Sequence, residues 1–387
     1  MRTAAAFLLG ALLLTACSSG APKASAKPKA SASATATASA APTPTPTLKP
    51  AGTFNYSTAT VAQGLVAPWS LDFAKDGAIW LTERPGRVRV IRNGQLLADP
   101  ALTLSVATAN GCEDGLLGLA LKEPYAYLYY TYNGGATNRI SRFTIAGDKL
   151  SGEQVILDNI PGGTCYHFGG RIKFGPDGLL YVTTGEGFVA ARAADKNNLS
   201  GKILRLHDDG SGEEVFAWGF RNPQGLAFDS AGRLYVSNNG PTGEFGLCCH
   251  DEVDYVQQGA FYGWPAWAAG TRTGYGQGSL PDRVGPMVES GSGVAWAPSG
   301  MTFFAASKGE TATLFLATLK AEVIRRFIVD PSDPSKVSAQ EIVFGGAGRM
   351  RDVAAGPDGC LYALTNNRDT RGTPGPGDDK VLKLCPP

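Results

Sequence analysis

The most informative stretch of the chain is Pro176-Asp177-Gly178-Leu179-Leu180-Tyr181-Val182, a turn followed by a short β-rich run. Asp-Gly supplies the positive φ that a tight hairpin turn requires, and the apolar and aromatic residues after it are typical of a strand. Five further copies of this pattern occur, two of them looser, at residues 76–81, 125–130, 230–236, 310–316 and 357–363. Each copy precedes a second β-rich segment, and these segments begin at residues 88, 140, 203, 253, 324 and 381. One strand-turn-strand unit therefore recurs six times between residues 60 and 385.

The spacing of these copies indicates the architecture. They lie about 50 residues apart, with one longer interval between the fourth and the fifth. A period of 40–50 residues with several strands in each unit is typical of a β-propeller, and no segment has a helical periodicity long enough to compete. Two unrelated β-sandwiches would not repeat one pattern six times. We therefore predict an all-β fold, a six-bladed β-propeller over residues 53–387, with ligands bound where the loops surround the central channel.

The first 52 residues have a different composition. Residues 4–14 are continuously apolar, which is too short for a membrane-spanning helix but matches the core of a signal peptide. Leu14-Thr15-Ala16-Cys17 resembles a bacterial lipobox, which implies a lipoprotein signal peptide at 1–16 and acylation of Cys17; an ordinary secretory signal is the alternative. Residues 18–52 are almost entirely Ala, Ser, Thr, Pro and Lys, so we predict a disordered linker from the lipidated Cys17 to residue 52. The expected location is outside the cytoplasm, with the lipid as the membrane anchor.

The charge distribution argues against a nucleic-acid partner. The 387-residue chain contains 35 Lys and Arg and 34 Asp and Glu. Five of the basic residues and none of the acidic ones lie in residues 1–52, so the remainder carries 30 basic and 34 acidic side chains, a formal charge of −4. Because nucleic-acid binding requires a basic field, we expect no nucleic acid to bind the predicted propeller.

The cysteines predict disulfides. With Cys17 lipidated, six cysteines remain in an exported chain, and they allow fifteen pairings. Cys360 opens one predicted strand of the last unit and Cys385 closes the next segment, so the two meet if these strands pair antiparallel. The other candidate pairs are Cys112–Cys165, which both precede channel-mouth motifs, and the adjacent Cys248–Cys249. Metal binding is the weaker alternative, because the spacing matches no zinc pattern.

Few polar residues are candidates for chemistry. His167 lies in Tyr166-His167-Phe168-Gly169-Gly170-Arg171, just before the first strand of the third unit, and its side-chain pKa suits a general base. Alone it could equally be an ordinary loop histidine. Phosphate-binding loops, nucleophile elbows and His-Glu-x-x-His pairs are absent from the sequence. Four cations occur at similar strand edges of the repeated units, namely Arg221, Lys320, Arg349 and Arg351. Together they would line one channel mouth, which suits a small ligand with several carboxylates. The alternative is that they are ordinary surface charges.

Several motifs together resemble a known family. In chain order they are Pro68-Trp69-Ser70-Leu71, Thr82-Glu83-Arg84-Pro85-Gly86, Gly115-Leu116-Leu117-Gly118-Leu119, His167-x-Gly169-Gly170-Arg171, Arg221-Asn222-Pro223-Gln224-Gly225, Asn239-Gly240-Pro241, Asp251-Glu252-Val253-Asp254 and Tyr262-Gly263-Trp264-Pro265. The combination, which spans residues 60–384, resembles the glucose/sorbosone dehydrogenase family, the soluble aldose sugar dehydrogenases that use pyrroloquinoline quinone (PQQ). The resemblance implies a propeller that holds PQQ and Ca²⁺ at its channel mouth.

The resemblance also implies roles for individual residues. His167 would remove the proton from the C1 hydroxyl of the sugar, and Arg221 would stabilise negative charge on the quinone oxygen, with Asn222 also contacting the cofactor. The carbonyl oxygens of Gly240 and Pro241 would ligate Ca²⁺. The PQQ carboxylates would bind to Lys320, Arg349 and Arg351. The implied reaction is oxidation of an aldose at C1 to the lactone, with hydride transfer to PQQ and electrons passed to an external acceptor.

The chain departs from the family pattern at several points. Phe168 replaces a polar residue, and Asn238-Asn239 replaces the commoner Glu-His pair. Glu113 stands where some members have a Gln beside the cofactor, which makes it a further candidate for cofactor binding. Residues 243–250 form an insertion with no counterpart. Two other classes stay open: a non-catalytic propeller that binds a carbohydrate or a protein, and a lactonase-like hydrolase, although no converging set of metal-binding carboxylates is evident.

Overall fold

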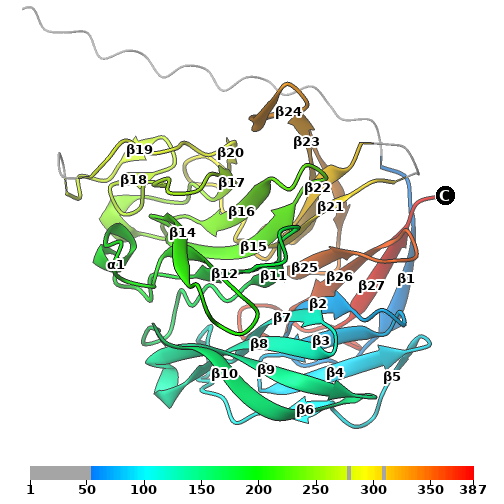
Figure 1. Cartoon of the computed structure of the whole chain (residues 1–387). Helices are drawn as coiled ribbons and strands as arrows, with labels where there is room; N and C mark the ends of the chain where they lie inside the picture. The colour runs from blue at the N-terminus through cyan, green and yellow to red at the C-terminus, as the bar shows by residue number, and fades with distance from the viewer. Residues whose placement is uncertain (1–53, 277–279, 307–310) are drawn as a thin grey trace, which may run out of the picture. The chain divides into compact units, whose positions relative to one another are not determined.

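The computed structural model describes residues 54–276, 280–306 and 311–387, and these residues form an all-β structure (Figure 1). The predicted signal peptide, Cys17 and the linker to residue 52 lie outside the described residues, so these assignments stay predictions. The helical elements within the described ranges are the short α1 (Ala191–Ala194), η1 (Asn133–Gly135) and η2 (Glu244–Gly246). None of the helices in this part of the chain is long and apolar enough to cross a membrane.

In the described residues six antiparallel sheets form the blades, and each consists of four main strands. The first contains β2 (Pro68–Phe73), β3 (Ile79–Glu83), β4 (Arg87–Arg92) and β5 (Gln95–Leu96), with β6 (Leu102–Thr103) also paired to β4. The second contains β7 (Leu116–Lys122), β8 (Tyr125–Tyr132), β9 (Thr137–Ala146) and β10 (Lys149–Pro161). The third contains β11 (Ile172–Phe174), β12 (Leu180–Thr184), β13 (Lys202–Leu206) and β14 (Glu214–Trp218).

The remaining three sheets follow the same plan. The fourth contains β15 (Asn222–Phe228), β16 (Leu234–Asn239), β17 (Glu252–Val256) and β20 (Val288–Glu289). The fifth contains β21 (Pro298–Phe304), β22 (Thr313–Thr318), β23 (Val323–Asp330) and β24 (Asp333–Gly345). The sixth contains β25 (Met350–Ala355), β26 (Leu361–Thr365), β27 (Val381–Cys385) and β1 (Ser57–Ala62). The first strands β2, β7, β11, β15, β21 and β25 contact one another in a closed ring, so the predicted six-bladed β-propeller is confirmed.

The repeated sequence pattern forms the second strand of each blade. Its copies become β3, β8, β12, β16, β22 and β26, and the β-rich segments that follow become the third strands. In the third blade Gly178 has a φ of +79° and donates its N–H to the Gly175 carbonyl, while Asp177 accepts the N–H of Leu179. The short-range turn chemistry of Asp-Gly therefore determines where this blade reverses, and the same pair occurs at Asp76-Gly77 in the first blade and Asp358-Gly359 in the sixth.

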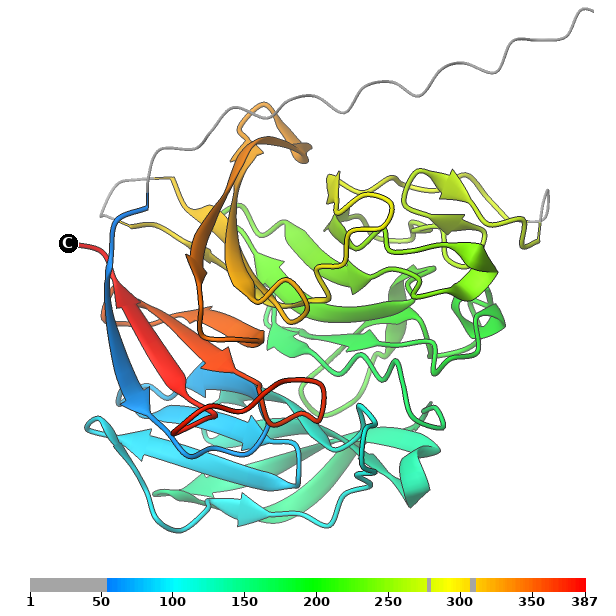
Figure 2. The same cartoon turned by 180° about the vertical axis from the view of Figure 1, so that it is seen from behind.

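The last blade closes the ring with a strand from the other end of the chain. β1 pairs antiparallel with β27, from Ser57 opposite Cys385 to Ala62 opposite Val381, and the two strands lie side by side in both views (Figures 1 and 2). This pairing satisfies the outer edge of β27, which would otherwise expose backbone donors and acceptors. The sequence repeat did not predict this pairing, because the first copy of the repeat begins after β1.

The long interval between the fourth and fifth copies contains additional structure outside the blade plan. β18 (Trp267–Ala268) and β19 (Thr271–Arg272) form a separate two-stranded sheet. The chain then returns through β20, which pairs with β17 as the outer strand of the fourth blade. Apolar side chains from neighbouring sheets pack between the blades, as in the cluster that joins the first and second blades through Trp80, Val88, Leu116 and Leu128. This packing holds the channel-mouth loops in place.

Candidate functional site

A cavity of about 550 Å³ lies where loops from several blades converge. It is lined by most of the residues that the sequence singled out: Glu113, His167, Arg221, Asn222, Gly240, Lys320, Arg349 and Arg351. Pro241 does not line it, and lies instead on a neighbouring space of about 10 Å³. The fold therefore brings to one cavity residues that are up to 238 positions apart in the sequence, from Glu113 to Arg351.

His167 is buried at the cavity wall and is held by a carboxylate. Its Nδ1 lies 2.5 Å from Oε1 of Glu186, a residue that follows β12 and is almost fully buried. In the tautomer that donates from Nδ1 to this carboxylate, Nε2 of the imidazole is left as an acceptor. His167 has a φ of +62°, and the Gly187 N–H donates to its carbonyl at 3.0 Å. The loop thus presents a histidine whose tautomer and orientation suit a general base.

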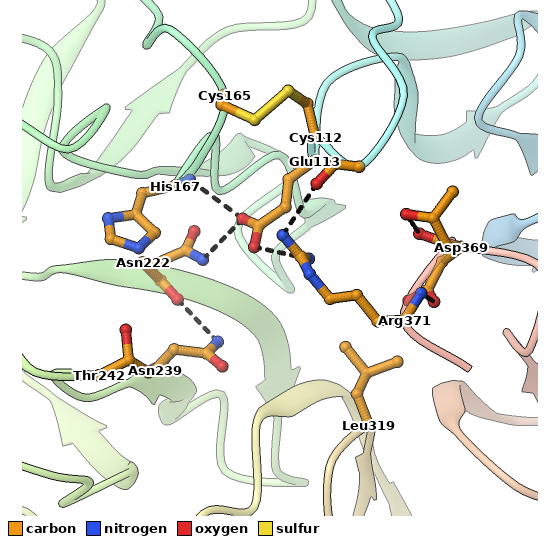
Figure 3. Close-up of polar contacts among 12 residues, drawn as sticks. Cys112, Glu113, Cys165, His167, Asn222, Asn239, Thr242, Leu319, Asp369 and Arg371 are labelled. Carbon is orange, nitrogen blue, oxygen red and sulfur yellow. Dashed lines mark hydrogen bonds and ion pairs between the residues drawn. A yellow bond between two sulfur atoms is a disulfide. The ribbon is translucent and has the colours of Figure 1, made fainter. Parts of the chain in front are cut away.

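Glu113 connects three other residues of the site (Figure 3). Its Oε2 accepts the backbone N–H of His167 at 3.0 Å and the amide of Asn222 at 3.4 Å, while its Oε1 lies 3.0 Å from Nη1 of Arg371. The neighbouring Cys112 is bonded to Cys165, so this loop is tied to the loop that carries His167. Burial acts to raise the pKa of Glu113, but the positive charge that His167 carries when it is protonated, together with Arg371, outweighs burial and lowers the pKa. The carboxylate of Glu113 therefore accepts hydrogen bonds from three other residues of the site.

Asn222 extends this network into the fourth blade. Its Oδ1 accepts the N–H of Gly169 at 3.1 Å, and its carbonyl accepts the side-chain amide of Asn239 at 3.0 Å (Figure 3). Its own N–H donates to Oδ1 of Asn238 at 3.0 Å. Asn222 thus joins the histidine loop to the ends of β15 and β16, and the Asn238-Asn239 pair that departs from the family pattern has a structural role here.

Arg221 lies against the same cavity with a relative exposure of 2%. Its Nε donates to Oε1 of Glu244 at 2.8 Å, and its Nη2 contacts the same carboxylate and Oγ1 of Thr242 at 3.2 Å. Its Nη1 makes a longer contact of 3.4 Å with the carbonyl of Asn239, and the guanidinium faces the ring of Trp264 at 5.7 Å. A fixed, buried cation therefore borders the space in which a ligand would lie.

Two further arginines and a lysine also line the cavity. Nε and Nη2 of Arg349 bind Oδ2 of Asp369 at 3.0 and 2.9 Å, and Arg351 lies 3.7 Å from the same oxygen. Nη1 of Arg351 also donates to Oε1 of Gln224 at 2.8 Å. Burial acts to raise the pKa of Asp369, but the two arginines keep it below its usual value. Lys320 is exposed, and within the described ranges its ammonium has no hydrogen bond or ion pair.

The charge at the cavity wall favours an anionic ligand. Five cationic side chains line the cavity, namely Arg221, Lys320, Arg349, Arg351 and Arg371, against two anionic ones, Glu113 and Asp251. Two further carboxylates, Asp369 and Glu244, bind three of the arginines. The four arginines each have a carboxylate partner. In the part of the chain that the structure describes, Lys320 is the cation of the cavity wall that has none. A small ligand with several carboxylates matches this arrangement.

The predicted metal ligands lie next to the cavity. The N–H of Gly240 donates to Oδ1 of Asp251 at 2.9 Å. A Cβ at Gly240 would lie 1.9 Å from the carbonyl oxygen of Cys249, so only glycine permits this close approach. No group of three or more His, Cys, Asp or Glu side chains in the described ranges is arranged to hold a metal ion. A cation here would depend on main-chain carbonyl oxygens, which are hard donors suited to Ca²⁺.

The three expected disulfides occur in the structure. They are Cys112–Cys165, Cys248–Cys249 and Cys360–Cys385. The first joins two loops of the site, the second lines the cavity, and the third joins the start of β26 to the end of β27. The antiparallel pairing of β26 with β27 is the reason that the last pair meets.

Four polar residues of the site were not singled out from the sequence: Glu186, Glu244, Asp369 and Arg371. All four lie in loops that follow a strand, and each pairs with a residue of another loop. A local signal existed for Glu186 alone, since Thr183-Thr184-Gly185-Glu186-Gly187 follows a second strand of the repeat, where channel-mouth loops begin. The other three depend on which loops the propeller brings together.

Comparisons with known proteins agree with the fold. A family model for Glucose / Sorbosone dehydrogenase matches residues 65–373. Among solved structures, the chain is similar to an oxidoreductase (glucose dehydrogenase) from Thermus thermophilus, at 39% identity and a TM-score of 0.76 over 85% of this chain and 100% of that one. It is also similar to the PQQ-bound aldose sugar dehydrogenase from Streptomyces coelicolor, at 30% identity and a TM-score of 0.72 over 86% and 99%. The aldose sugar dehydrogenase YliI of Escherichia coli is 30% identical over 334 residues, which cover 77% of this chain and 87% of that protein. The chain belongs to the glucose/sorbosone dehydrogenase family.

Proposed function

We propose that the protein is a PQQ-dependent aldose sugar dehydrogenase that oxidises the C1 position of the sugar to the lactone. The observation that carries this proposal is one cavity that combines a carboxylate-held histidine, His167, with a cluster of cations. The relatives named as aldose sugar dehydrogenases, one of them PQQ-bound, support this choice.

The residues of the cavity fit PQQ, a planar quinone with three carboxylates. Lys320, Arg349 and Arg351 would bind the carboxylates, because they offer charged N–H donors on one side of the cavity. Arg221 and Asn222 would contact the quinone side, and Glu113 would orient the amide of Asn222. Glu113 itself would not bind a carboxylate of the cofactor, because its lowered pKa favours the anionic form and like charges repel. Its part in cofactor binding would be to position Asn222.

Ca²⁺ is part of the proposal on ligand chemistry. Carbonyl oxygens of Gly240 and Pro241 would supply protein ligands, and Gly240 already borders the cavity. The ion would add positive charge beside Arg221 and assist it electrostatically. Removal of Ca²⁺ by a chelator should therefore weaken PQQ binding. Adding Ca²⁺ back should restore it.

The protein residues would organise the reaction as follows. Nε2 of His167 accepts the proton of the C1 hydroxyl, because Glu186 holds the proton on Nδ1 and stabilises the imidazolium that forms. The bound cofactor supplies the quinone that accepts the hydride from C1. Arg221 donates hydrogen bonds toward the oxygen on which negative charge develops. The product sugar would carry the C1 carbonyl of a lactone, and an external acceptor would take up the two electrons.

The cellular placement of this activity is also proposed. The lipobox-like Cys17 supports a protein anchored by lipid to the cell membrane and acting outside the cytoplasm. The three disulfides of the propeller are consistent with export into an oxidising compartment. Mass determination of the mature protein would test this placement, since acylation adds a defined mass to Cys17.

Reconstitution is the direct test of the function. Purified protein is loaded with PQQ and Ca²⁺, cofactor uptake is measured by absorbance, and dye reduction is followed with a panel of aldoses. Stoichiometric uptake with sugar-dependent dye reduction would support the proposal. A folded protein that takes up no PQQ would contradict it and favour a non-catalytic propeller that binds a carbohydrate or protein.

A further inference from the structure

The insertion at residues 243–250 forms part of the cavity wall. Its two cysteines, Cys248 and Cys249, line the cavity. The insertion is held on both sides by β-bridges, one between Thr242 and Cys248 and one between Cys249 and Ser292. The N–H of Gly243 also donates to the carbonyl of Leu247 at 2.9 Å. Backbone hydrogen bonds therefore fix this loop in the cavity wall.

One side chain of the insertion reaches Arg221. Oε1 of Glu244 accepts from both Nε and Nη2 of Arg221, while Nη2 also contacts Thr242. These contacts occupy one edge of the planar guanidinium. Among the described residues Nη1 has only the 3.4 Å contact with the carbonyl of Asn239, so Nη1 is the nitrogen with donor capacity left for a ligand. Because the guanidinium is planar, fixing Nε and Nη2 of Arg221 also determines the direction in which Nη1 points.

The same carboxylate also holds the adjoining backbone. Oε2 of Glu244 accepts the N–H of Thr242 at 2.7 Å. Thr242 directly follows Gly240 and Pro241, the proposed carbonyl ligands of Ca²⁺. The side chain of Glu244 is 20% exposed and that of Arg221 is 2% exposed, so the pair is largely shielded from water. Burial acts to raise the pKa of Glu244, but Arg221 outweighs it and holds the pKa below its usual value.

We propose that Glu244 is a positioning residue that aims Arg221 at the quinone of the bound cofactor and reduces the net positive charge that the cofactor meets. This inference rests on the proposed function, because it assigns Arg221 to the same site. It separates two effects of one side chain. Orientation depends on an oxygen that accepts from Nε and Nη2, whereas the charge effect depends on the negative charge of the carboxylate.

Two substitutions separate these effects. Glu244→Gln removes the charge and keeps one oxygen that can accept from Arg221, although its NH2 cannot accept the N–H of Thr242. PQQ should bind this variant about three- to tenfold more tightly because one repulsive charge near a trianion is gone. Its kcat should stay within about threefold of the parent, because the guanidinium is still held. Glu244→Ala removes both, and kcat should fall about ten- to a hundredfold with little change in the KM for sugar, because Arg221 is no longer aimed. Glu213→Gln, at an exposed glutamate, is the matched control and should change neither quantity.

The measurements are PQQ titration by quenching of tryptophan fluorescence, dye-reduction kinetics, and thermal unfolding of each variant. A merely structural role for Glu244 would weaken PQQ binding in both variants in parallel with lower melting temperatures. Unchanged or weaker PQQ affinity in a folded Glu244→Gln variant overturns the charge effect, and an unchanged kcat in Glu244→Ala overturns the positioning effect.

Failure of the proposed function gives a different result. A parent protein that binds PQQ but oxidises no aldose would contradict the assigned reaction, while the affinity comparison would still decide the charge effect. If the parent binds no PQQ, crystal structures of the parent and of Glu244→Ala without cofactor decide the geometry. We expect the Arg221 guanidinium to leave its place at the cavity wall in the variant, and an unmoved guanidinium would overturn the inference.

Discussion

Single residues in this site act in acid–base pairs whose members come from different loops. Glu186 binds Nδ1 of His167 and leaves its other ring nitrogen without this partner, which suits the proton acceptor that we propose. Asp369 plays a different part, because it holds two buried arginines in place while its own pKa stays low. Lys320, without such a partner in the described ranges, is left to meet an incoming anion. The basic side chains of the site therefore differ in whether a carboxylate binds them, and the roles that we propose for them follow from this difference.

Replacing the histidine should separate catalysis from cofactor binding. In His167→Ala we expect sugar oxidation to fall about 10²- to 10⁴-fold, which is the usual contribution of a general base, while PQQ affinity changes little. Dye-reduction kinetics and PQQ titration measure the two quantities. His207→Ala is the matched control, since His207 is exposed on a turn away from the cavity. Equal loss of turnover and of PQQ affinity would instead make His167 a cofactor-binding residue.

Arg351 should affect cofactor binding above all. Arg351→Ala removes a buried guanidinium at the cavity wall, and we expect PQQ affinity to fall about tenfold to a hundredfold, the usual range for a lost charge-assisted hydrogen bond. Titration of the variant with PQQ measures this loss. Arg233→Ala serves as the control, because Arg233 pairs with Asp229 on a hairpin turn outside the cavity. An unchanged affinity would remove Arg351 from the site.

At the scale of one element, β17 carries two acids on the same face. Glu252 and Asp254 are two residues apart in a strand, so their side chains point to the same side, and both are buried. Burial, and the charge of Glu252, raise the pKa of Asp254 well above its usual value. In the described part of the chain Oδ2 of Asp254 has no hydrogen-bond partner. This strand therefore carries an electrostatic cost that should depend on pH.

Asp254→Asn should stabilise the protein more at high pH than at low pH. Folded Asp254 retains its proton after the unfolded chain has lost it, so unfolding releases a proton and stability falls as the pH rises above the unfolded pKa. Asparagine is neutral throughout, so the gain in unfolding free energy should grow by at most about 1.4 kcal/mol per pH unit. Melting temperatures at pH 5, 6.5 and 8 measure the effect. The exposed Asp99→Asn should show no such trend, and a gain independent of pH would contradict the buried-acid explanation.

At the scale of the whole molecule, the ring depends on a strand supplied by the N-terminal end of the propeller. β1 covers the outer edge of β27, and Phe54, just before it, packs against Phe315 with ring centroids 5.1 Å apart. The hydroxyl of Tyr56 also donates to the carbonyl of Val343. The sixth blade is thus completed by residues about 320 positions away, and the Cys360–Cys385 disulfide secures β27 against β26. Closure of this kind leaves no unpaired edge on β27.

Removing the closing strand should weaken the entire propeller. A chain that begins at Leu65 lacks Phe54, Tyr56 and β1, and should melt at least about 10 °C below a chain that begins at Phe54. We also expect it to self-associate, because the edge of β27 becomes available for pairing with another copy. Thermal unfolding and size-exclusion chromatography of the two chains measure these effects. Equal melting temperatures would mean that the other blades hold the ring without β1.

The amino-acid sequence by itself determined the number of blades and the two middle strands of each blade. Those features depend on local chemistry, namely a turn followed by a β-rich run, which each blade repeats. In three of the six copies the turn contains Asp-Gly, as at Asp177-Gly178. Motif resemblance also identified His167, Arg221 and the distal cations, and the structure brings them to one cavity.

The tertiary structure alone decided which partners those residues have. Glu186, Glu244 and Asp369 are ordinary acids in the sequence, and they acquire roles because the ring brings loops of different blades within hydrogen-bond distance. The pairing of β1 with β27 was hidden for the same reason, since the residues that pair lie at opposite ends of the described chain. Local turn preferences are encoded within a few residues, whereas long-range pairing depends on packing of the complete ring, which no short stretch of sequence contains.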